Sequence, residues 1–341
     1  MERSLRYPPV LRRARVLAVS AELAQIELLE GPLAGKTVPG VFYRHLGAAP
    51  AEGDEVVTNT LGLEMGLGTG GVAVIFPSRD ESTRSPANEH HFVKLPYTPL
   101  QFPAPAPPQA ENLSGMPVVV LPLHSHLAPA CCAARDLRPG CRVAFLWQEG
   151  GALPVAFSRI VRDLKRNDLL HAVVSAGSCF GGDLEAPHVY AGLLASAAGA
   201  PDLVLAGIGP GIVGTATAFG HGGMAAAIAL NAASSLGAEP VLAPRLSGAD
   251  PRGRHLGLSH HTRSALRAAL TSCRVALPTH FEVPTEVLPD RHRYEVVEAS
   301  AAGLEERFGV TFESMGRRYE DDPVFFDAAV AAVTLALGEE T

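Results

Sequence analysis

The 341-residue sequence contains little lysine and few cysteines, and each scarcity excludes a kind of chemistry. The lysines are Lys36, Lys94 and Lys165, so most positive charge is arginine, which favours bidentate contacts with anions over Schiff-base chemistry. The 5 cysteines show no C-x-x-C spacing, and an odd number in a chain of this length does not indicate a disulfide framework.

Long apolar runs and a basic charge balance are also missing. The longest apolar stretch, residues 225–236, is interrupted by Asn231, Ser234 and Ser235, and it is shorter than the about 20 residues that cross a bilayer. The first residues contain no apolar signal core, so we expect a cytoplasmic protein without a membrane partner. With 28 Lys+Arg against 35 Asp+Glu the net charge is −7, which disfavours general binding of nucleic acid.

The first part of the chain reads as β-structure. Residues 15–77 consist of short apolar runs separated by Gly and Pro turns, a spacing that predicts a small antiparallel β-barrel, to which we assign residues 1–100. The proline-dense segment 103–108 is unable to build a helix or a central strand. Residues 101–115 are therefore predicted to be a semi-rigid linker.

From residue 116 onward, unbroken apolar runs alternate with helical segments. This alternation is typical of a buried parallel sheet, so residues 116–341 are predicted to form a Rossmann-like α/β domain, a parallel sheet flanked by helices. The predicted strands are residues 118–123, 142–147, 170–175, 203–208, 241–244, 274–277 and 293–298, and the predicted helices are residues 127–135, 154–166, 186–198, 213–236, 262–272 and 323–337.

Ligands of open α/β sheets bind outside the carboxyl ends of the strands, so the residues after each apolar run are the first candidates for a site. Histidine gathers there, more than solvated loops alone would explain. Eight of the 13 histidines lie in or beside these segments: His124, His126, His171, His221, His255, His260, His261 and His280.

The glycine-rich segment 209–215 (GPGIVGT) follows a predicted strand and is expected to open a helix. Gly209, Gly211 and Gly214 let the backbone approach a ligand, and a helix N-terminus presents free N–H groups to an anion. The alternative is a tight turn that only packs closely. Because Arg245 stands where a dinucleotide site has an acidic residue, we predict that these glycines and Thr215 bind a generic anion.

Residues 181–185 (GGDLE) precede another predicted helix. Asp183 either caps that helix or acts as a general base, and we predict that it is catalytic. Gly181, Gly182 and Glu185 are predicted to line the ligand beside it.

The loop after the fifth predicted strand combines arginine with histidine. Arg245, Asp250, Arg252, Arg254 and His255 suit a phosphate or carboxylate ligand, although the arginines could instead pair with surface acids.

The remaining histidines leave two chemistries open. His124, His260 and His261 are predicted to be acid–base groups, with His124 and His260 near Asp183. Together with His126 and Asp183 they could instead bind a transition metal. Adjacent His260 and His261 point in different directions on a helix, and such divergent pairs make a tetrahedral site hard to assemble. We therefore predict no metal ligands.

Taken together, these motifs resemble the uncharacterised bacterial family catalogued as domain of unknown function 3866. Two segments depart from it, because residues 148–149 (QE) stand where the family has Thr-Asp and residues 219–222 (FGHG) replace Gly-Phe-Ser-Gly. The resemblance implies no activity. It rests on residues 53–54 (GD), 67–71 (LGTGG), 94–101 (KLPYTPLQ), 123–125 (LHS), 152–154 (ALP), 180–186 (FGGDLEA), 209–215 (GPGIVGT), 250–252 (DPR), 254–255 (RH) and 259–262 (SHHT).

The leading functional prediction is an enzyme, a hydrolase or a transferase, that acts on a small phosphorylated or nucleotide-like anion. Its cofactor is left unknown, and self-association into a homo-oligomer remains open. One alternative is a metal-dependent hydrolase that uses the same histidines. Another is a non-catalytic ligand-sensing or assembly protein whose pocket binds without reacting.

Overall fold

The computed structural model describes residues 9–20, 23–44, 46–66, 71–77, 92–282 and 288–338. The chain divides into two compact units, one of Met1–Asn88 with Tyr97–Phe102 and one of Glu89–Pro96 with Pro103–Thr341. Residues 67–70, within the segment 67–71 (LGTGG) on which the resemblance rests, lie outside the described residues. The second unit includes residues 92–96 because Lys94 is anchored there: its Nζ donates to Ser175 O at 3.3 Å and to Ala186 O at 3.0 Å.

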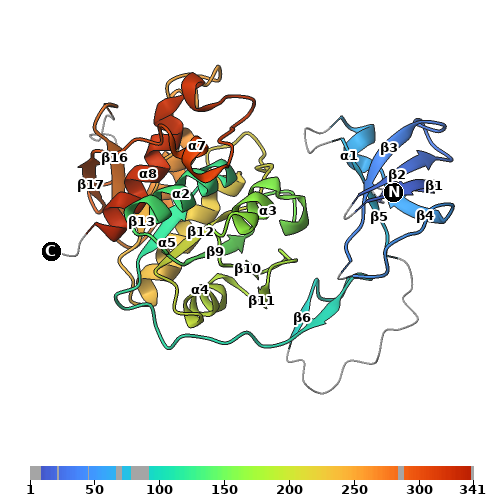
Figure 1. Cartoon of the computed structure of the whole chain (residues 1–341), viewed down its shortest axis with the longest axis horizontal. Helices are drawn as coiled ribbons and strands as arrows, with labels where there is room; N and C mark the ends of the chain where they lie inside the picture. The colour runs from blue at the N-terminus through green and yellow to red at the C-terminus, as the bar shows by residue number, and fades with distance from the viewer. Residues whose placement is uncertain are drawn as a thin grey trace, which may run out of the picture. The chain divides into compact units, whose positions relative to one another are not determined.

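The first unit contains a closed barrel, as predicted (Figure 1). Its strands are β1 (Leu11–Val19), β2 (Leu23–Leu28), β3 (Thr37–Val41), β4 (Glu55–Asn59) and β5 (Ala73–Ile75), and the short helix α1 (Leu61–Glu64) follows β4. The strand order is β1-β2-β3-β5-β4, and β4 closes the barrel against β1. The pairings are antiparallel except for β3 with β5, which is parallel.

The barrel interior explains the alternating pattern of its strands. Ala14, Val16, Ala24 and Ile26 point inward with their neighbours and form the core, while the residues between them face outward. Gly40 leaves room on the inner face, because a Cβ there would lie 2.8 Å from Ile75 Cδ1, which would then have to shift. After the barrel, β6 (Phe92–Lys94) and β7 (Phe102–Ala104) form a two-stranded sheet.

The second unit is built on an eight-stranded sheet in which every pairing is parallel. Its order is β11-β10-β9-β12-β8-β13-β16-β17. The predicted fold class, a parallel α/β sheet flanked by helices with a small β-barrel before it, is therefore confirmed. The strands are β8 (Val118–Leu121), β9 (Val143–Gln148), β10 (Ala172–Ala176), β11 (Leu184–Ala186), β12 (Leu203–Ile208), β13 (Val241–Leu242), β16 (Arg274–Pro278) and β17 (Arg293–Val297).

Helices cover both faces of this sheet (Figure 1). One core contains residues of α2 (Leu127–Leu137), α3 (Arg159–Arg166), α7 (Leu304–Phe308) and α8 (Pro323–Leu337), and the other contains residues of α4 (Val189–Ala198), α5 (Ala225–Ser235) and α6 (His260–Ala268). No helix among the described residues has the length and apolarity needed to span a bilayer.

The connections place a topological switch at the centre of the sheet. After β8 the chain continues into α2, and after β9 into α3, and both helices lie on one face of the sheet. Strand β12 lies between β8 and β9, but it is followed by α5 on the other face. The carboxyl ends of the strands at such a switch form the usual ligand-binding crevice of open α/β folds.

Three predicted helices begin later than expected: α3, predicted from residue 154, begins at Arg159, and the other two carry predicted site residues. The segment predicted as residues 186–198 starts with β11, and α4 begins at Val189 with His188 as its N-cap. The segment predicted as residues 213–236 stays irregular until the 3-10 turn η3 (Gly222–Met224), which leads into α5. Both differences move predicted site residues out of helix N-termini.

Candidate functional site

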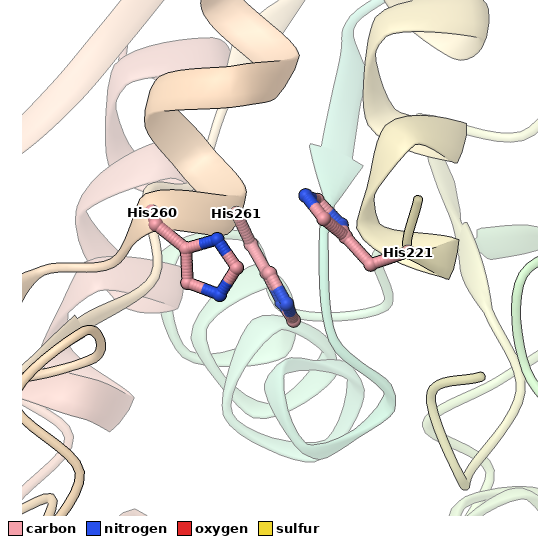
Figure 2. A group of neighbouring side chains, drawn as sticks. All are labelled: His221, His260 and His261. Atoms are coloured by element: carbon pink, nitrogen blue, oxygen red, sulfur yellow. The ribbon is translucent and has the colours of Figure 1, made fainter. Parts of the chain in front are cut away.

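Four histidines lie together beyond the carboxyl ends of the central strands, and we call His221, His255, His260 and His261 the histidine group. His260 and His261 are the first two residues of α6, whose N-cap Ser259 accepts a hydrogen bond from the His261 N–H at 3.2 Å. His221 immediately precedes η3. Figure 2 shows that the three imidazoles of His221, His260 and His261 face a common space from these two elements.

The rings of the histidine group are in contact with one another. The His221 and His261 rings are stacked with centroids 4.0 Å apart, and the His260 and His261 centroids are 4.4 Å apart. His255 lies 4.9 Å from His260 and 4.8 Å from His261 between ring centroids. The expectation that adjacent His260 and His261 diverge is therefore wrong, because α6 begins at His260 and its first turn presents both rings on the same side.

The hydrogen-bond partners of His221 and His261 show which nitrogen of each ring carries the proton. His221 Nε2 lies 3.0 Å from the Ala218 carbonyl oxygen, which only accepts, so Nε2 carries the proton and Nδ1 carries a lone pair. His261 Nδ1 lies 3.3 Å from Arg245 Nη1, which only donates, so Nδ1 accepts and Nε2 carries the proton. The group thus offers one proton acceptor and one proton donor on stacked rings.

Burial keeps these imidazoles neutral. It lowers the pKa of His261 to about 2, aided by the charge of His221 and Arg245, and lowers the pKa of His255 to about 3. Burial also lowers the pKa of His221 and of His260. A neutral imidazole can accept a proton or ligate a metal, whereas an imidazolium can do neither.

A buried carboxylate beside the group holds three arginines. Asp250 Oδ2 lies 2.7 Å from Arg252, 3.2 Å from Arg245 and 3.4 Å from Arg317, and its side chain is fully buried. Hydrogen bonds from Arg252 hold the pKa of Asp250 well below its usual range. Asp250 therefore positions the arginines, and among the described residues the recorded partners of its carboxylate are these cations and the Arg252 N–H.

The structure brings part of the predicted site together. Arg245 and His255 contact His261, and Asp250 joins Arg245 to Arg252. The His260 N–H donates to the Arg254 carbonyl oxygen at 3.0 Å.

The glycine-rich segment 209–215, here called the glycine loop, contacts the histidine group at one end only. Gly214 forms an antiparallel bridge with His221, and the Thr215 N–H donates to Gly220 O at 2.7 Å. Gly209 and Gly211 pack instead against the loop after β9, where Gly211 O accepts from the Ala152 N–H at 2.7 Å. The predicted helix N-terminus at Gly211 and Gly214 is absent, because the loop pairs with these neighbouring segments before η3 begins.

Asp183 is separated from the histidine group, so the prediction that it lies near His124 and His260 is wrong. It immediately precedes the edge strand β11, and its Oδ2 accepts from the Val173 N–H at 2.7 Å, near the amino end of β10. Its carboxylate also pairs with Lys165. Strands β9, β12 and β8 lie between β10 and β13, from which Arg245 extends.

The other residues of the predicted 181–185 segment serve the sheet edge. The Gly181 N–H donates to Glu185 Oε1 at 2.7 Å, and the Gly182 N–H donates to Ser175 Oγ at 2.8 Å. Glu185 Oε2 lies 3.1 Å from Lys94 Nζ, which is buried. This ion pair fixes β6 against β10 and β11.

His124 is held by a different set of partners. Its Nδ1 lies 3.2 Å from Ile208 O and its Nε2 lies 2.7 Å from Ser158 Oγ. Ser158 is also the N-cap of α3, accepting from the Val161 N–H at 3.0 Å. Both His124 nitrogens are thereby occupied, which gives this residue a structural role at the ends of β8 and β12.

Two residues of the site were not predicted from the sequence. His221 was noted among the histidines beside the strand ends but was not assigned to the site, since its nearest partner His261 is 40 residues away along the chain. Arg317, from a segment that follows α7, is the third arginine that pairs with Asp250. Neither contact leaves a local sequence signal.

The chain belongs to the family described as "Protein of unknown function (DUF3866)", whose model matches residues 40–333. No curated protein matches the sequence. Among solved structures, the crystal structure of YjeQ from Thermotoga maritima is similar at 10% sequence identity and a TM-score of 0.17. That match covers 76% of this chain and 66% of the YjeQ chain, just under two thirds of its length.

Proposed function

We propose that the protein is an enzyme, a hydrolase or a transferase, that acts on a small phosphorylated or nucleotide-like anion beside the histidine group. The observation that carries the proposal is the pair of stacked imidazoles, one with a lone pair at His221 Nδ1 and one with a proton at His261 Nε2. Such a pair can take a proton from an attacking hydroxyl group and give one to a leaving group or a phosphoryl oxygen.

The charge around the pair supports an anionic substrate. Arg245, Arg252 and Arg317 share the two carboxylates Asp250 and Asp322, which leaves one positive charge in excess. Arg254 adds an exposed guanidinium for which no ion pair with a described residue is recorded. Guanidinium groups bind phosphate and carboxylate through charge-assisted hydrogen bonds.

Binding of inorganic phosphate, pyrophosphate and AMP, measured by calorimetry in the presence of a chelator, tests this proposal. We expect at least one of the three to bind, and Arg254→Gln to weaken that binding about tenfold or more, the value of one charge-assisted hydrogen bond. Arg166→Gln, an exposed arginine of α3 paired with Asp163, is the matched control and should leave the affinity unchanged. Failure of all three anions to bind, both with the chelator and after zinc is supplied, refutes the proposal.

The alternative of a sensing or assembly protein gives a different result in the same material. A non-catalytic role would be favoured if an anion binds and the rate of phosphate release is the same in the unmodified protein and in His221→Gln. Hydrolysis or transfer that is lost in His221→Gln while the anion still binds supports the enzyme.

A further inference from the structure

Three ring nitrogens of the histidine group are arranged as a metal site would require. One potential ligand atom from each of His221, His260 and His261 lies within 4.8 Å of the other two. Within the described parts of the chain, no other group of three His, Cys, Asp or Glu residues has this property. The three rings come from the start of α6 and from the residue before η3, so two rigid elements hold them (Figure 2).

Two ring nitrogens of these histidines are buried without a hydrogen-bond partner. His221 Nδ1 and His260 Nε2 have none among the described residues, and His221 is only 9% exposed. An unpaired buried polar atom costs free energy, and most such atoms in folded proteins are satisfied by some partner. A cation between the rings would satisfy both nitrogens at once.

The second-sphere contacts of His221 match those of a metal-ligating histidine. Such a histidine usually donates its other ring N–H to a carbonyl or carboxylate, which fixes the tautomer and aims the lone pair. His221 does this through Nε2 and Ala218 O at 3.0 Å.

The backbone beside His221 Nδ1 also leaves room for a ligand. A Cβ at residue 223 would lie 3.0 Å from His221 Nδ1, so Gly223 keeps the space next to that lone pair open.

We propose that His221, His260 and His261 hold one divalent transition-metal ion of the zinc class, whose remaining position is open to water or to the anionic substrate. Imidazole nitrogens favour such ions, and three protein ligands with an open fourth position are the usual arrangement of catalytic zinc. With the ion bound, His221 and His261 act as ligands and not as the proton-transferring pair. The open position therefore rests only on the anionic substrate of the proposed function, whereas binding of the ion does not rest on that function. Zinc–nitrogen bonds of about 2.0–2.1 Å place tetrahedral ligands about 3.4 Å apart, so nitrogens that lie within 4.8 Å of one another have to close by at most about 1.4 Å.

Arg245 competes with the ion for His261. Its Nη1 donates to His261 Nδ1 at 3.3 Å, which leaves the proton on Nε2 and no lone pair there. Ligation through Nε2 moves the proton to Nδ1 and separates that nitrogen from the guanidinium. Ligation through Nδ1 displaces Arg245 directly. In both cases Arg245 keeps its 3.2 Å contact with Asp250, and its loss should tighten binding of the ion.

The test uses the full chain, stripped with a chelator and then dialysed against zinc or cobalt chloride. We expect about one equivalent of metal per chain by elemental analysis, and a visible absorption band typical of tetrahedral cobalt. His221→Ala and His260→Gln should each weaken metal affinity by more than the roughly 10- to 100-fold that removal of an outer-sphere partner costs. Arg245→Gln should strengthen it.

His171→Ala is the matched control, because this exposed histidine bonds Arg142 at the opposite end of the sheet and should leave the stoichiometry unchanged. His260 is only half-buried, so His260→Gln carries the test if His221→Ala fails to fold, as judged by circular dichroism. A stoichiometry well below one, or metal retained with equal affinity in the folded His260→Gln variant, overturns the proposal.

Phosphate binding with the chelator present separates this proposal from the proposed function. If phosphate binds with the chelator present, but dialysis against zinc chloride fails to load one equivalent of zinc, only the metal site is refuted. Zinc bound at one equivalent, with no anion binding in the presence or absence of zinc, refutes the anion-directed enzyme and leaves the metal site standing.

Discussion

Lowering the pH from about 7.5 to about 5.5 should destabilise the α/β unit through His124 and His126, because both rings are buried and must stay neutral in the folded chain. Burial lowers the pKa of His124 to about 4 and that of His126 to about 3, against an ordinary value of 6.5. Only the unfolded chain therefore takes up these protons, and the free energy of unfolding falls as the pH falls through 6.5.

The magnitude follows from the linkage relation. Between these two pH values the unfolded-state protonation of each ring rises from about one tenth to about nine tenths, while the folded-state rings stay almost unprotonated. The integrated loss is about 1.4 kcal/mol for each histidine and nearly 3 kcal/mol for the pair. That is a sizeable part of the about 5–15 kcal/mol that stabilises a typical domain.

Urea unfolding at the two pH values, followed by tryptophan fluorescence, measures the total loss, to which the neutral rings of His255 and His261 also contribute. Trp147 is the single tryptophan, is buried in the α/β unit, and lies 5.0 Å from the His124 ring, so the signal reports on this unit. In His126→Gln the pH-dependent loss should shrink by about 1.4 kcal/mol. His171→Gln, at an exposed site, should leave it unchanged. An equal loss in His126→Gln and in the unmodified protein would refute the reasoning.

Three further substitutions have effects that follow from single contacts. Lys94→Met leaves the Glu185 carboxylate, 13% exposed, without the Nζ that lies 3.1 Å away. It should lower the free energy of unfolding by about 3–5 kcal/mol, with part recovered by adding Glu185→Gln, as thermal melts would measure. Ser158→Ala removes the N-cap of α3 and should cost about 1–2 kcal/mol in urea unfolding. A Cβ in Gly222→Ala would lie 1.8 Å from Gly150 O, so one of the two backbones must shift, and we expect a loss on the order of 2 kcal/mol together with weaker zinc binding.

Sequence patterns predicted the α/β sheet well because its strands are buried on both faces. All residues of β12 are buried, and its predicted range, residues 203–208, agrees with the structure. The terminal helix was likewise predicted at residues 323–337, where Pro323 occupies its first turn. Strongly apolar segments of this kind carry their own signal, since their burial does not depend on a particular partner.

Short and irregular segments carried no such signal. β11 has three residues, one of them Glu185, so nothing marked it as a strand, and Asp183 was expected at a helix start instead. The glycine loop was expected to open a helix, but its backbone groups pair with Gly150, Ala152 and Gly220. The pairings with Gly150 and Ala152 involve a segment distant in sequence, which local propensity does not register.

The histidine group illustrates the same limit at the site itself. The sequence pointed to the carboxyl ends of the strands, and four of the histidines do gather there. Which of them meet was decided by long-range packing: η3 and α6 bring His221 to His261, while His124 is occupied by Ser158 and Ile208. The sequence thus predicted that histidines gather at the carboxyl ends of the strands, but not which of them contact one another.

Arg245 links the two proposals for this edge of the sheet. While it donates to His261 Nδ1, His261 presents an N–H at Nε2, which suits an anion and opposes a cation. When a metal ion takes His261, the guanidinium is left with Asp250 alone, and the positive charge of the ion adds to that of the arginines. An anion that fills the open position of the metal offsets this charge. Each ligand should therefore favour binding of the other, and by linkage zinc must raise the affinity for phosphate by the same factor as phosphate raises the affinity for zinc.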